Sequence, residues 1–313
     1  MYQFIVNPNA RSGLGLSIWN RVEEKLKKEN VSYQVHFTER SGHATEIARR
    51  LTEGDAPVTL VVLGGDGSVD EVVGGICCPE KTTLGYIPIG SSNDFARGLG
   101  LPADSMAALD VLLHSKKTRP LNLGLLHYGE HTRRFAVSAG IGYDADICHQ
   151  VSVSRLKVLL NRIGLGKLAY VGLSLKCLFR CKPDAMTVTL TLPSGTTDGA
   201  AKVLHFRKAY FASAFNLPYE GGGCKFCPDA LPDDDYLDLI VVADVPKLQA
   251  LAILPTVFSG RHTHLPGVHI YRFKRAEIAS DVPLPIHSDG EPIAPAERIA
   301  FSLETERIRV ITN

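Results

Sequence analysis

Residues 58–68 read VTLVVLGGDGS and carry the strongest signal for the fold. Val58–Leu63 is a continuous apolar run, typical of a strand that is buried on both faces of a parallel sheet. The glycine-rich turn Gly64–Ser68 follows directly, and Val69–Ile76 then has the apolar spacing of a helix. This order of strand, turn and helix predicts one unit of an α/β fold.

The same alternation extends to both sides of this unit. Ile18, Val22 and Leu26 are spaced four residues apart and predict one face of a helix. Strands that alternate with helices indicate a doubly wound parallel sheet, so we expect an α/β domain over residues 1–123. The expected strands are 3–6, 31–37, 58–63 and 84–89, and helical patterns lie near 18–26, 44–51, 69–76 and 106–113.

Residues 124–313 have a different rhythm and are expected to form a second, β-rich domain. Most links between the apolar runs are too short for crossover helices, which predicts a mostly antiparallel β-sandwich. One long helical insertion is expected around residues 152–180, and the tail from about residue 292 is a candidate to pack back on the first domain. The expected strands are 134–139, 186–192, 202–206, 209–214, 237–242, 268–273, 276–279 and 308–312.

Composition limits the classes of function. A length of 313 residues favours two domains, and 45% apolar with 21% charged residues excludes bulk disorder. Lys and Arg total 34 against 33 Asp and Glu, so the charge balance gives no indication of nucleic-acid binding. No apolar run approaches the roughly 20 residues of a membrane-spanning helix. We therefore expect a cytoplasmic protein.

The seven cysteines are expected to be reduced thiols, because their number is odd and the sequence from Met1 enters a strand without a signal peptide. Cys224 and Cys227 have the spacing of half a zinc site, and Cys177 and Cys181 could supply the other half. Small buried thiols are the more common reading of such pairs. A solvated turn is likewise the favoured reading of the segment Arg261–His264.

Three turns follow predicted strands of the first domain, at residues 7–13, 64–68 and 90–94, and all are rich in Gly, Ser and Asn. Glycine lets backbone N–H groups approach phosphate oxygens and reaches positive φ at low cost, and each following helix contributes its dipole. Asp66 and Asp94 would suit a divalent cation that bridges carboxylate and phosphate. One such turn could be an ordinary connection, but three together favour nucleotide binding. The standard signatures G-x-x-x-x-G-K-[ST] and G-x-G-x-x-G between strand and helix are both missing.

Four segments resemble motifs of the diacylglycerol kinase catalytic-domain family. Gly64–Val72 is similar to its GGDGT-x-NEV loop, and Asn7–Gly13 resembles its NP-x-SG turn. Pro88–Pro102 contains the sequence of its P-x-GT-x-NDFAR segment with Ser for Thr, and Asp289–Glu291 resembles its DGE motif. The GGDG element by itself also resembles NAD kinases and phosphofructokinases, so the resemblance implies a first domain of that class.

The resemblance implies an ATP- and Mg²⁺-dependent lipid kinase with its nucleotide in a cleft between the domains. Glu291 would be the general base for the lipid hydroxyl within the catalytic motif that includes Asp289, while Asp66 and Asp94 would position the catalytic Mg²⁺. The implied nucleotide contacts are Asn7, Ser12, Thr38, Gly64, Gly65, Asp66, Gly67, Ser68, Val69, Asp70, Ser91 and Asn93.

The resemblance also implies a structural Mg²⁺ in the turn 230–237, held by the carbonyls of Leu231 and Tyr236 and the carboxylate of Asp234. A solvated acidic loop is the alternative. Four positions depart from the family pattern and affect details of metal binding more than the reaction class. They are Ser68 for Thr, Asp70 for Asn, Asn122 for Asp and Asp235 for Gly.

No acidic residue occurs from Ile147 to Pro183, where basic and apolar residues are interleaved. Such a segment can lie on an anionic membrane surface, although a basic-edged helix packed on the sheet is an equal reading. The basic residues are Arg155, Lys157, Arg162, Lys167, Lys176, Arg180 and Lys182.

These features predict a peripheral enzyme of phospholipid biosynthesis that phosphorylates a hydroxyl of a membrane lipid. Diacylglycerol, which would give phosphatidic acid, is the first candidate for the acceptor. The alternatives are a phosphotransferase of the NAD kinase type with a soluble substrate, and a catalytically weak lipid-binding homologue. A homodimer is left open.

Overall fold

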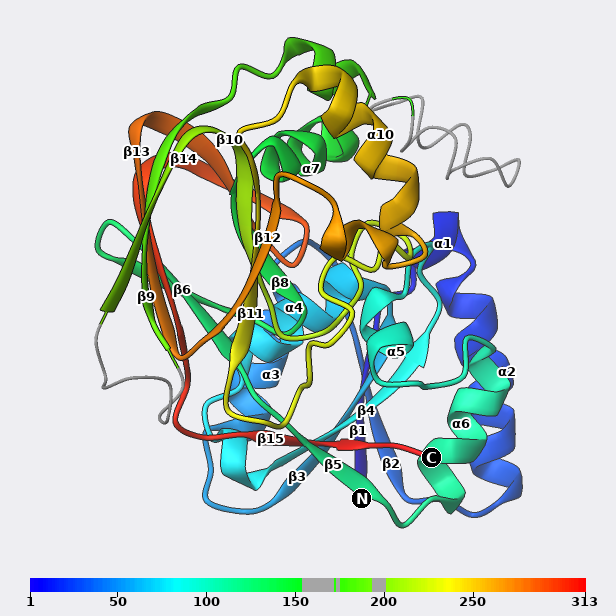
Figure 1. Cartoon of the computed structure of the whole chain (residues 1–313). Coiled ribbons are helices and arrows are strands. Elements are labelled where there is room, and N and C mark those ends of the chain that lie inside the picture. Colours follow the sequence, from blue (N-terminus) through cyan, green and yellow to red (C-terminus); the bar gives the residue numbers. More distant parts are fainter. Residues whose placement is uncertain (154–171, 173–174, 193–200) are drawn as a thin grey trace. The chain divides into compact units, whose positions relative to one another are not determined.

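The computed structural model describes residues 1–153, 172, 175–192 and 201–313 (Figure 1). These residues form two compact units, of which the first contains Met1–Leu123 together with Thr305–Asn313 and the second contains Gly124–Glu304. The α/β class of the first unit and the mostly antiparallel class of the second are confirmed.

The first unit is a six-stranded sheet with strand order β2-β1-β3-β4-β15-β5. The first four strands are parallel, whereas β15 pairs in parallel with β4 and antiparallel with β5. The strands are β1 Tyr2–Val6, β2 Tyr33–Phe37, β3 Val58–Gly64, β4 Thr82–Pro88, β5 Thr118–Leu121 and β15 Ile308–Ile311. The helices are α1 Ala10–Gly13, α2 Gly15–Lys28, α3 His43–Thr52, α4 Asp66–Gly75, η1 Pro79–Lys81, α5 Asp94–Gly98 and α6 Ser105–His114.

Helices cover both faces of this sheet (Figure 1). The predicted apolar face of α2 is buried together with Trp19, and it packs with α6 against alternate side chains of β1, β3 and β4. Residues between them, such as Ile5, Leu60 and Val62, are buried from the other face. β3 is therefore buried on both faces of the sheet, which explains its continuous apolar run.

The second unit is built on a nine-stranded sheet with strand order β12-β11-β10-β8-β13-β14-β6-β7, with β9 beside both β10 and β13. Its helices are α7 Tyr143–Val153, α10 Lys247–Val257 and η2 Arg261–His264, and residues 175–180 are also helical. The rest of the expected insertion lies outside the described residues. The strands are β6 Gly124–Tyr128, β7 His131–Phe135, β8 Ser138–Gly142, β9 Asp184–Thr191, β10 Ala201–Phe215, β11 Leu237–Ala243, β12 Val268–Phe273, β13 Arg275–Ser288 and β14 Glu291–Leu303.

Four details of the second part of the chain differ from the strands expected for it. The strands expected at 202–206 and 209–214 are one strand, β10, because a bulge rather than a turn separates Phe206 from Ala209 in its pairing with β9. The strand expected at 134–139 is interrupted at Ala136 and Val137, whose N–H groups bond the Asp289 carboxylate. The strand expected at 276–279 extends to Ser288, and the strand at 308–312 belongs to the first sheet.

The segment Arg261–His264 was expected to be a solvated turn, and this is wrong for one of its residues. His262 is fully buried in η2, and its Nε2 lies 2.8 Å from the carbonyl oxygen of Phe226. A buried core on the α10 side, which includes Ile240, Val242 and Val257, accounts for this inward position.

Candidate functional site

The three predicted turns of the first unit come together at one edge of its sheet. β1, β3 and β4 are neighbouring parallel strands, so their carboxyl ends point the same way. The N–H of Asn7 donates to the Leu63 carbonyl (3.0 Å), and the N–H of Ile89 donates to the Gly64 carbonyl (2.9 Å). In open α/β sheets this edge is where ligands bind.

Two of these turns also approach each other backbone to backbone. A Cβ atom added to Gly65 would lie 3.2 Å from the Cα of Gly90, and one added to Gly90 would lie 2.7 Å from the Cα of Gly65. Gly65 has φ −100° and ψ −173°, an extended conformation open to any residue. Gly65 therefore does not use the positive φ that glycine makes accessible, and close packing of the two turns is the reason for glycine here.

Side chains fix the separation of the turns. Asn93, with φ 52°, donates from Nδ2 to the Gly90 carbonyl (3.1 Å) and accepts from the Tyr86 hydroxyl at Oδ1 (3.3 Å). The same hydroxyl lies 3.3 Å from the Gly64 carbonyl oxygen, and Asn7 Nδ2 lies 3.5 Å from Ser68 Oγ. Polar groups from all three turns thus surround the start of α4.

The two acidic residues of these turns have different surroundings. The Asp66 carboxylate accepts the N–H of Phe95 (3.1 Å), and burial raises its pKa although backbone N–H groups at Phe95, Asp94 and Asn93 oppose the rise. Asp94 is buried and pairs with Arg97. Carboxylate oxygens are hard donors of the kind that Mg²⁺ prefers, so both residues are chemically suited to that ion.

The other expected nucleotide contacts are dispersed around this edge. Thr38 follows β2 and donates its N–H to the Val6 carbonyl (2.9 Å), while Ser91 is exposed. Val69 and Asp70 are buried in α4, so any ligand contact of Val69 would be through its backbone. Gly67 lies in the first turn of α4 and Ser12 lies in α1. Asn122, a departure from the family pattern, is also buried.

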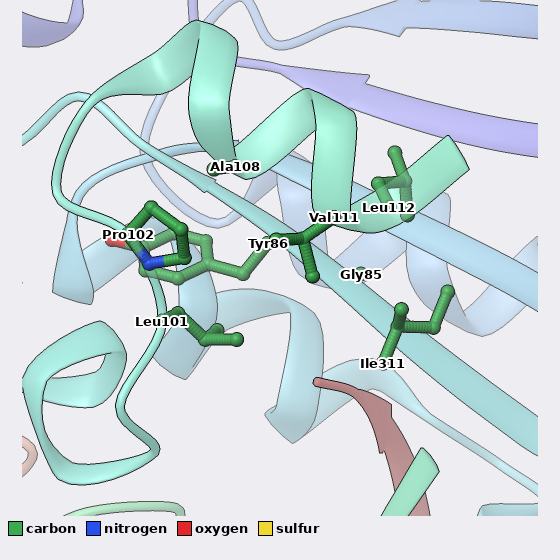
Figure 2. A pocket seen from close by; sticks show the side chains of 8 residues that line it. All are labelled: Gly85, Tyr86, Leu101, Pro102, Ala108, Val111, Leu112 and Ile311. Carbon is green, nitrogen blue, oxygen red and sulfur yellow. The ribbon is translucent and has the colours of Figure 1, made fainter. Parts of the chain in front are cut away.

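A small pocket of the first unit is distinct from this edge. It lies between β4 and α6, and its wall includes Tyr86, Leu101, Leu112 and Ile311 (Figure 2). Its volume of about 10 Å³ is close to the least that holds one water molecule. We interpret it as a packing gap in the core beside Tyr86.

In the second unit, the DGE motif forms the turn that joins β13 to β14. Asp289 and Gly290 have φ values of 48° and 80°, and the exposed Glu291 begins β14. The Asp289 carboxylate accepts three backbone N–H groups, from Ala136 (2.7 Å), Val137 (2.8 Å) and Ser138 (2.9 Å). Asp289 therefore holds the backbone, and Glu291 is the carboxylate of this motif that faces solvent.

The expected structural metal turn contains a cation from the chain itself. Arg272 Nη1 lies 3.2 Å from Asp234 Oδ2, and Arg272 Nε lies 3.3 Å from Asp238 Oδ1. Asp234 Oδ1 accepts the N–H of Tyr236 (3.0 Å), and Asp235 adopts a positive φ of 66° where the family has Gly. Asp234 Oδ2 is buried without a hydrogen bond of good geometry, so the turn still fits a hard cation. Exposed Leu231 lies in the same turn.

Sequence reasoning missed a buried polar cluster under the DGE turn, formed by Asp144, Cys148, Glu220 and His287. The predicted thiol pairs, Cys224 with Cys227 and Cys177 with Cys181, do not form a metal-ligand group within the described ranges. None of the seven cysteines, all of which lie in the described residues, forms a disulfide. The signal for the cluster was a histidine in the apolar context of β13, but its partners are far away in sequence.

Two family models match the chain. The "Diacylglycerol kinase catalytic domain" matches residues 1–126, and the "YegS C-terminal NAD kinase beta sandwich-like domain" matches residues 136–312. A Bacillus subtilis protein named "Putative lipid kinase YtlR" is 30% identical, with 98% of each chain covered. A Staphylococcus saprophyticus protein named diacylglycerol kinase is 29% identical, with 92% of this chain and 88% of that protein covered.

Solved structures agree on the fold. A crystal structure of a diacylglycerol kinase from Bacillus anthracis has a TM-score of 0.70 at 20% identity, covering 100% of this chain and 96% of that chain. An NAD kinase from Archaeoglobus fulgidus in complex with ATP has a TM-score of 0.52 at 12% identity, covering 100% of this chain and 94% of that chain.

The fold and the two matching family models define a class of kinases whose architecture is similar to that of NAD kinases. Within that class, the chain belongs to the diacylglycerol kinase catalytic-domain family, which makes it a lipid kinase at the level of the family. Among the described residues, none of the helices has both the length and the apolar character needed to cross a bilayer.

Proposed function

We propose that this protein transfers the γ-phosphoryl group of ATP to the free hydroxyl of diacylglycerol and so produces phosphatidic acid. The observation that carries the proposal is the backbone contact between Gly65 and Gly90 at the carboxyl ends of β3 and β4. This contact leaves little room for a side chain at Gly65 and none at Gly90, and it holds the two turns together at the start of α4. Names of relatives support diacylglycerol as the acceptor.

The proposed roles divide between binding and proton transfer. The turns Gly64–Ser68 and Gly90–Asn93 would present N–H groups and the α4 dipole to the phosphates. Asp66 and Asp94 would hold Mg²⁺, which when bound neutralises charge on the phosphates. Glu291 would take the acceptor hydroxyl's proton as that oxygen attacks the γ-phosphorus, and ADP would leave. In the second unit, Asp234 with the carbonyls of Leu231 and Tyr236 would hold a second, structural Mg²⁺.

Glu291→Gln tests the proton transfer. We expect turnover of ATP with diacylglycerol vesicles to fall by about 10²–10⁴-fold, because the amide cannot accept the proton. ATP affinity, measured by calorimetry, should stay within about twofold, since Glu291 is not among the proposed nucleotide contacts. Near-wild-type turnover of the purified variant would remove Glu291 from the mechanism.

The fold also favours a second candidate, an NAD kinase-like transfer to a soluble acceptor, because the second family model and one solved structure carry that likeness. The two functions differ in their acceptor. ATP turnover that requires diacylglycerol vesicles and yields labelled phosphatidic acid supports the lipid kinase. ATP turnover that requires NAD and proceeds without vesicles would instead support the NAD kinase-like function and contradict the lipid kinase proposal.

A described surface of the second unit supports peripheral membrane contact. Phe179 and Leu248 are 64% and 77% exposed, and the Lys247 ammonium donates to the Phe179 carbonyl (2.9 Å), which places the two segments together. Lys176, Arg180 and Lys182 are exposed beside Phe179 in sequence. Exposed apolar side chains flanked by basic ones are typical of interfacial helices. Arg155, Lys157, Arg162 and Lys167 lie outside the described residues.

A further inference from the structure

Directly below the Asp289–Gly290 turn, the second unit contains a cluster of metal-ligating side chains that the phosphoryl transfer does not use. It consists of Cys148 from α7, Glu220 from the segment before β11 and His287 from the end of β13. Their exposed fractions are 9%, 8% and 0%, respectively. Thiol, carboxylate and imidazole groups are rarely gathered in a core without a charge to balance.

The three side chains have the spacing of ligands around one ion. One ligand atom from each lies within 4.8 Å of the others, and His287 Nδ1 is 3.5 Å from Glu220 Oε1. Ligand atoms in a tetrahedral zinc site are separated by about 3.3–3.8 Å, which follows from bond lengths near 2.0–2.3 Å. The imidazole and the carboxylate are therefore already at a coordinating separation.

A second carboxylate fixes the orientation of the imidazole. His287 Nε2 lies 3.1 Å from Asp144 Oδ2, and the Asp144 carboxylate is itself held by the Ala145 N–H (2.7 Å) and the Ser213 hydroxyl. A proton on Nε2 that is donated to Asp144 leaves the Nδ1 lone pair directed to Glu220. Metal-binding histidines commonly donate their other N–H to a carboxylate in this way. The Gly290 N–H is a weak competitor for Nδ1, at 3.4 Å.

We propose that Cys148, Glu220 and His287 bind a zinc ion, with Asp144 as the positioning residue for His287. A thiolate ligand favours Zn²⁺ over the hard cations Mg²⁺ and Ca²⁺. Three protein ligands leave one position for water. Because His287 precedes Asp289 by two residues, the ion would anchor β13 where the DGE turn begins.

The competing arrangement is a metal-free ion network. Burial opposes a charge on His287, but the carboxylates of Glu220 and Asp144 outweigh it and raise the pKa of the imidazole to about 9. In that arrangement the imidazolium replaces the ion and the Cys148 thiol keeps its proton. Metal binding separates the two arrangements, because it requires thiolate and neutral imidazole.

The experiment is a titration of EDTA-treated full-length protein with Zn²⁺ against a chromophoric chelator, and with Co²⁺ followed by absorbance. We expect one equivalent of tight binding for the wild type, a thiolate-to-Co²⁺ charge-transfer band, and a higher Tm with Zn²⁺. Cys148→Ser should lose the band and weaken Zn²⁺ binding by at least tenfold. His287→Gln should weaken it similarly where that variant folds.

Cys224→Ser is the matched control, because Cys224 is also buried and lies near Glu220 in sequence. It should bind Zn²⁺ like the wild type. A wild type without stoichiometric binding would overturn the proposal in favour of the ion network. Equal binding by Cys148→Ser, or loss only in Cys224→Ser, would equally overturn it by placing the metal elsewhere. None of these measurements uses ATP or lipid, so their outcome is independent of the proposed kinase activity.

Discussion

Gly65 and Gly90 are the residues at which a single methyl group should matter most. A Cβ at Gly65 meets the Gly90 Cα at 3.2 Å, so the neighbouring turn must yield by a few tenths of an ångström. A Cβ at Gly90 meets the Gly65 Cα at 2.7 Å, and backbone atoms cannot rotate away. We therefore expect ATP affinity, measured by calorimetry, to fall for Gly65→Ala and to fall further for Gly90→Ala.

Gly74→Ala provides the control for this series. Gly74 lies in α4, the helix that follows Gly65, and a Cβ there would meet nothing within 4 Å. Alanine in a helix interior is favoured over glycine by about 0.5–1 kcal/mol, so this variant should be slightly more stable and bind ATP normally. Equal ATP affinity in all three variants would contradict the assignment of these turns to the nucleotide.

His262 should make stability depend on pH. Burial lowers the pKa of its imidazole below the usual 6.5, although the bond to the Phe226 carbonyl opposes the shift. The unfolded chain then binds the proton more readily, so stability present above pH 6.5 is lost as the pH falls towards the folded pKa. The contribution of one such group is at most about 1.4 kcal/mol per pH unit.

Urea unfolding at pH 7 and pH 5 should isolate this contribution. His262→Gln keeps a donor for the Phe226 carbonyl but cannot be protonated. We expect the free energy of unfolding of the wild type to fall more between the two pH values than that of the variant. A parallel decrease in both proteins would assign the pH dependence to other groups.

Residues of the glycine-rich turns could be predicted from sequence because each turn is a local signal. The glycines and acids of segments 64–68 and 90–94 follow apolar strands, and parallel pairing brings such ends together. Arg272 and His287 could not be found in this way. Their partners, Asp234 and Glu220, are distant in sequence, and only the pairing of strands in three dimensions reveals them.

At the scale of elements, the Asp289 carboxylate connects the β13–β14 turn to the β7–β8 link through three backbone N–H groups. Asp289→Ala would leave these buried donors without an acceptor, which costs roughly 3–5 kcal/mol. We expect the free energy of unfolding of the second unit to fall by this amount, which would appear as a lower midpoint in urea. Glu291→Gln, two residues later and exposed, should leave the midpoint unchanged. Similar midpoints for the two variants would mean that Asp289 does not hold the link.

The elements of the first unit could be predicted better than those of the second. Its first four strands are short and separated by helices, so the change of period marks their boundaries, whereas β5 has no such signal and was missed. β13 and β14 instead contain Pro283, Pro285, Pro292 and Pro295, and bulges shift their register between Ala279 and Ile286. Proline normally counts against a strand, and long-range pairing outweighs that local preference here.

At the scale of the whole molecule, the exposed basic surface of the second unit should control access to lipid. Lys176→Glu with Arg180→Glu removes two cations beside Phe179. At about 1 kcal/mol for each lost cation, partitioning onto anionic vesicles should fall by at least about thirtyfold in a sedimentation assay, because the added carboxylates are also repelled. Activity on a short-chain, detergent-dispersed diacylglycerol should remain, because this acceptor needs no docking. Raising the salt concentration should have the same effect on the wild type.

Arg21→Glu with Lys28→Glu is the control for net charge. Both residues are exposed on α2 of the first unit, and the double variant changes the total charge by the same amount. It should sediment like the wild type. An equal loss of sedimentation in the two double variants would indicate a general charge attraction to the vesicles rather than a docking surface. Unchanged sedimentation of both would show that Lys176 and Arg180 do not bind the membrane.

The position of β15 has a consequence for how this chain is made. β15 separates β4 from β5 in the first sheet, yet it is translated after the whole of the second unit. A nascent chain that has completed residues 1–123 therefore still exposes one edge of β4 and has no partner for β5. The sheet of the first unit can therefore be completed only after the second unit has been synthesised. A stop codon before Thr305 would thus damage the half of the protein that is encoded first.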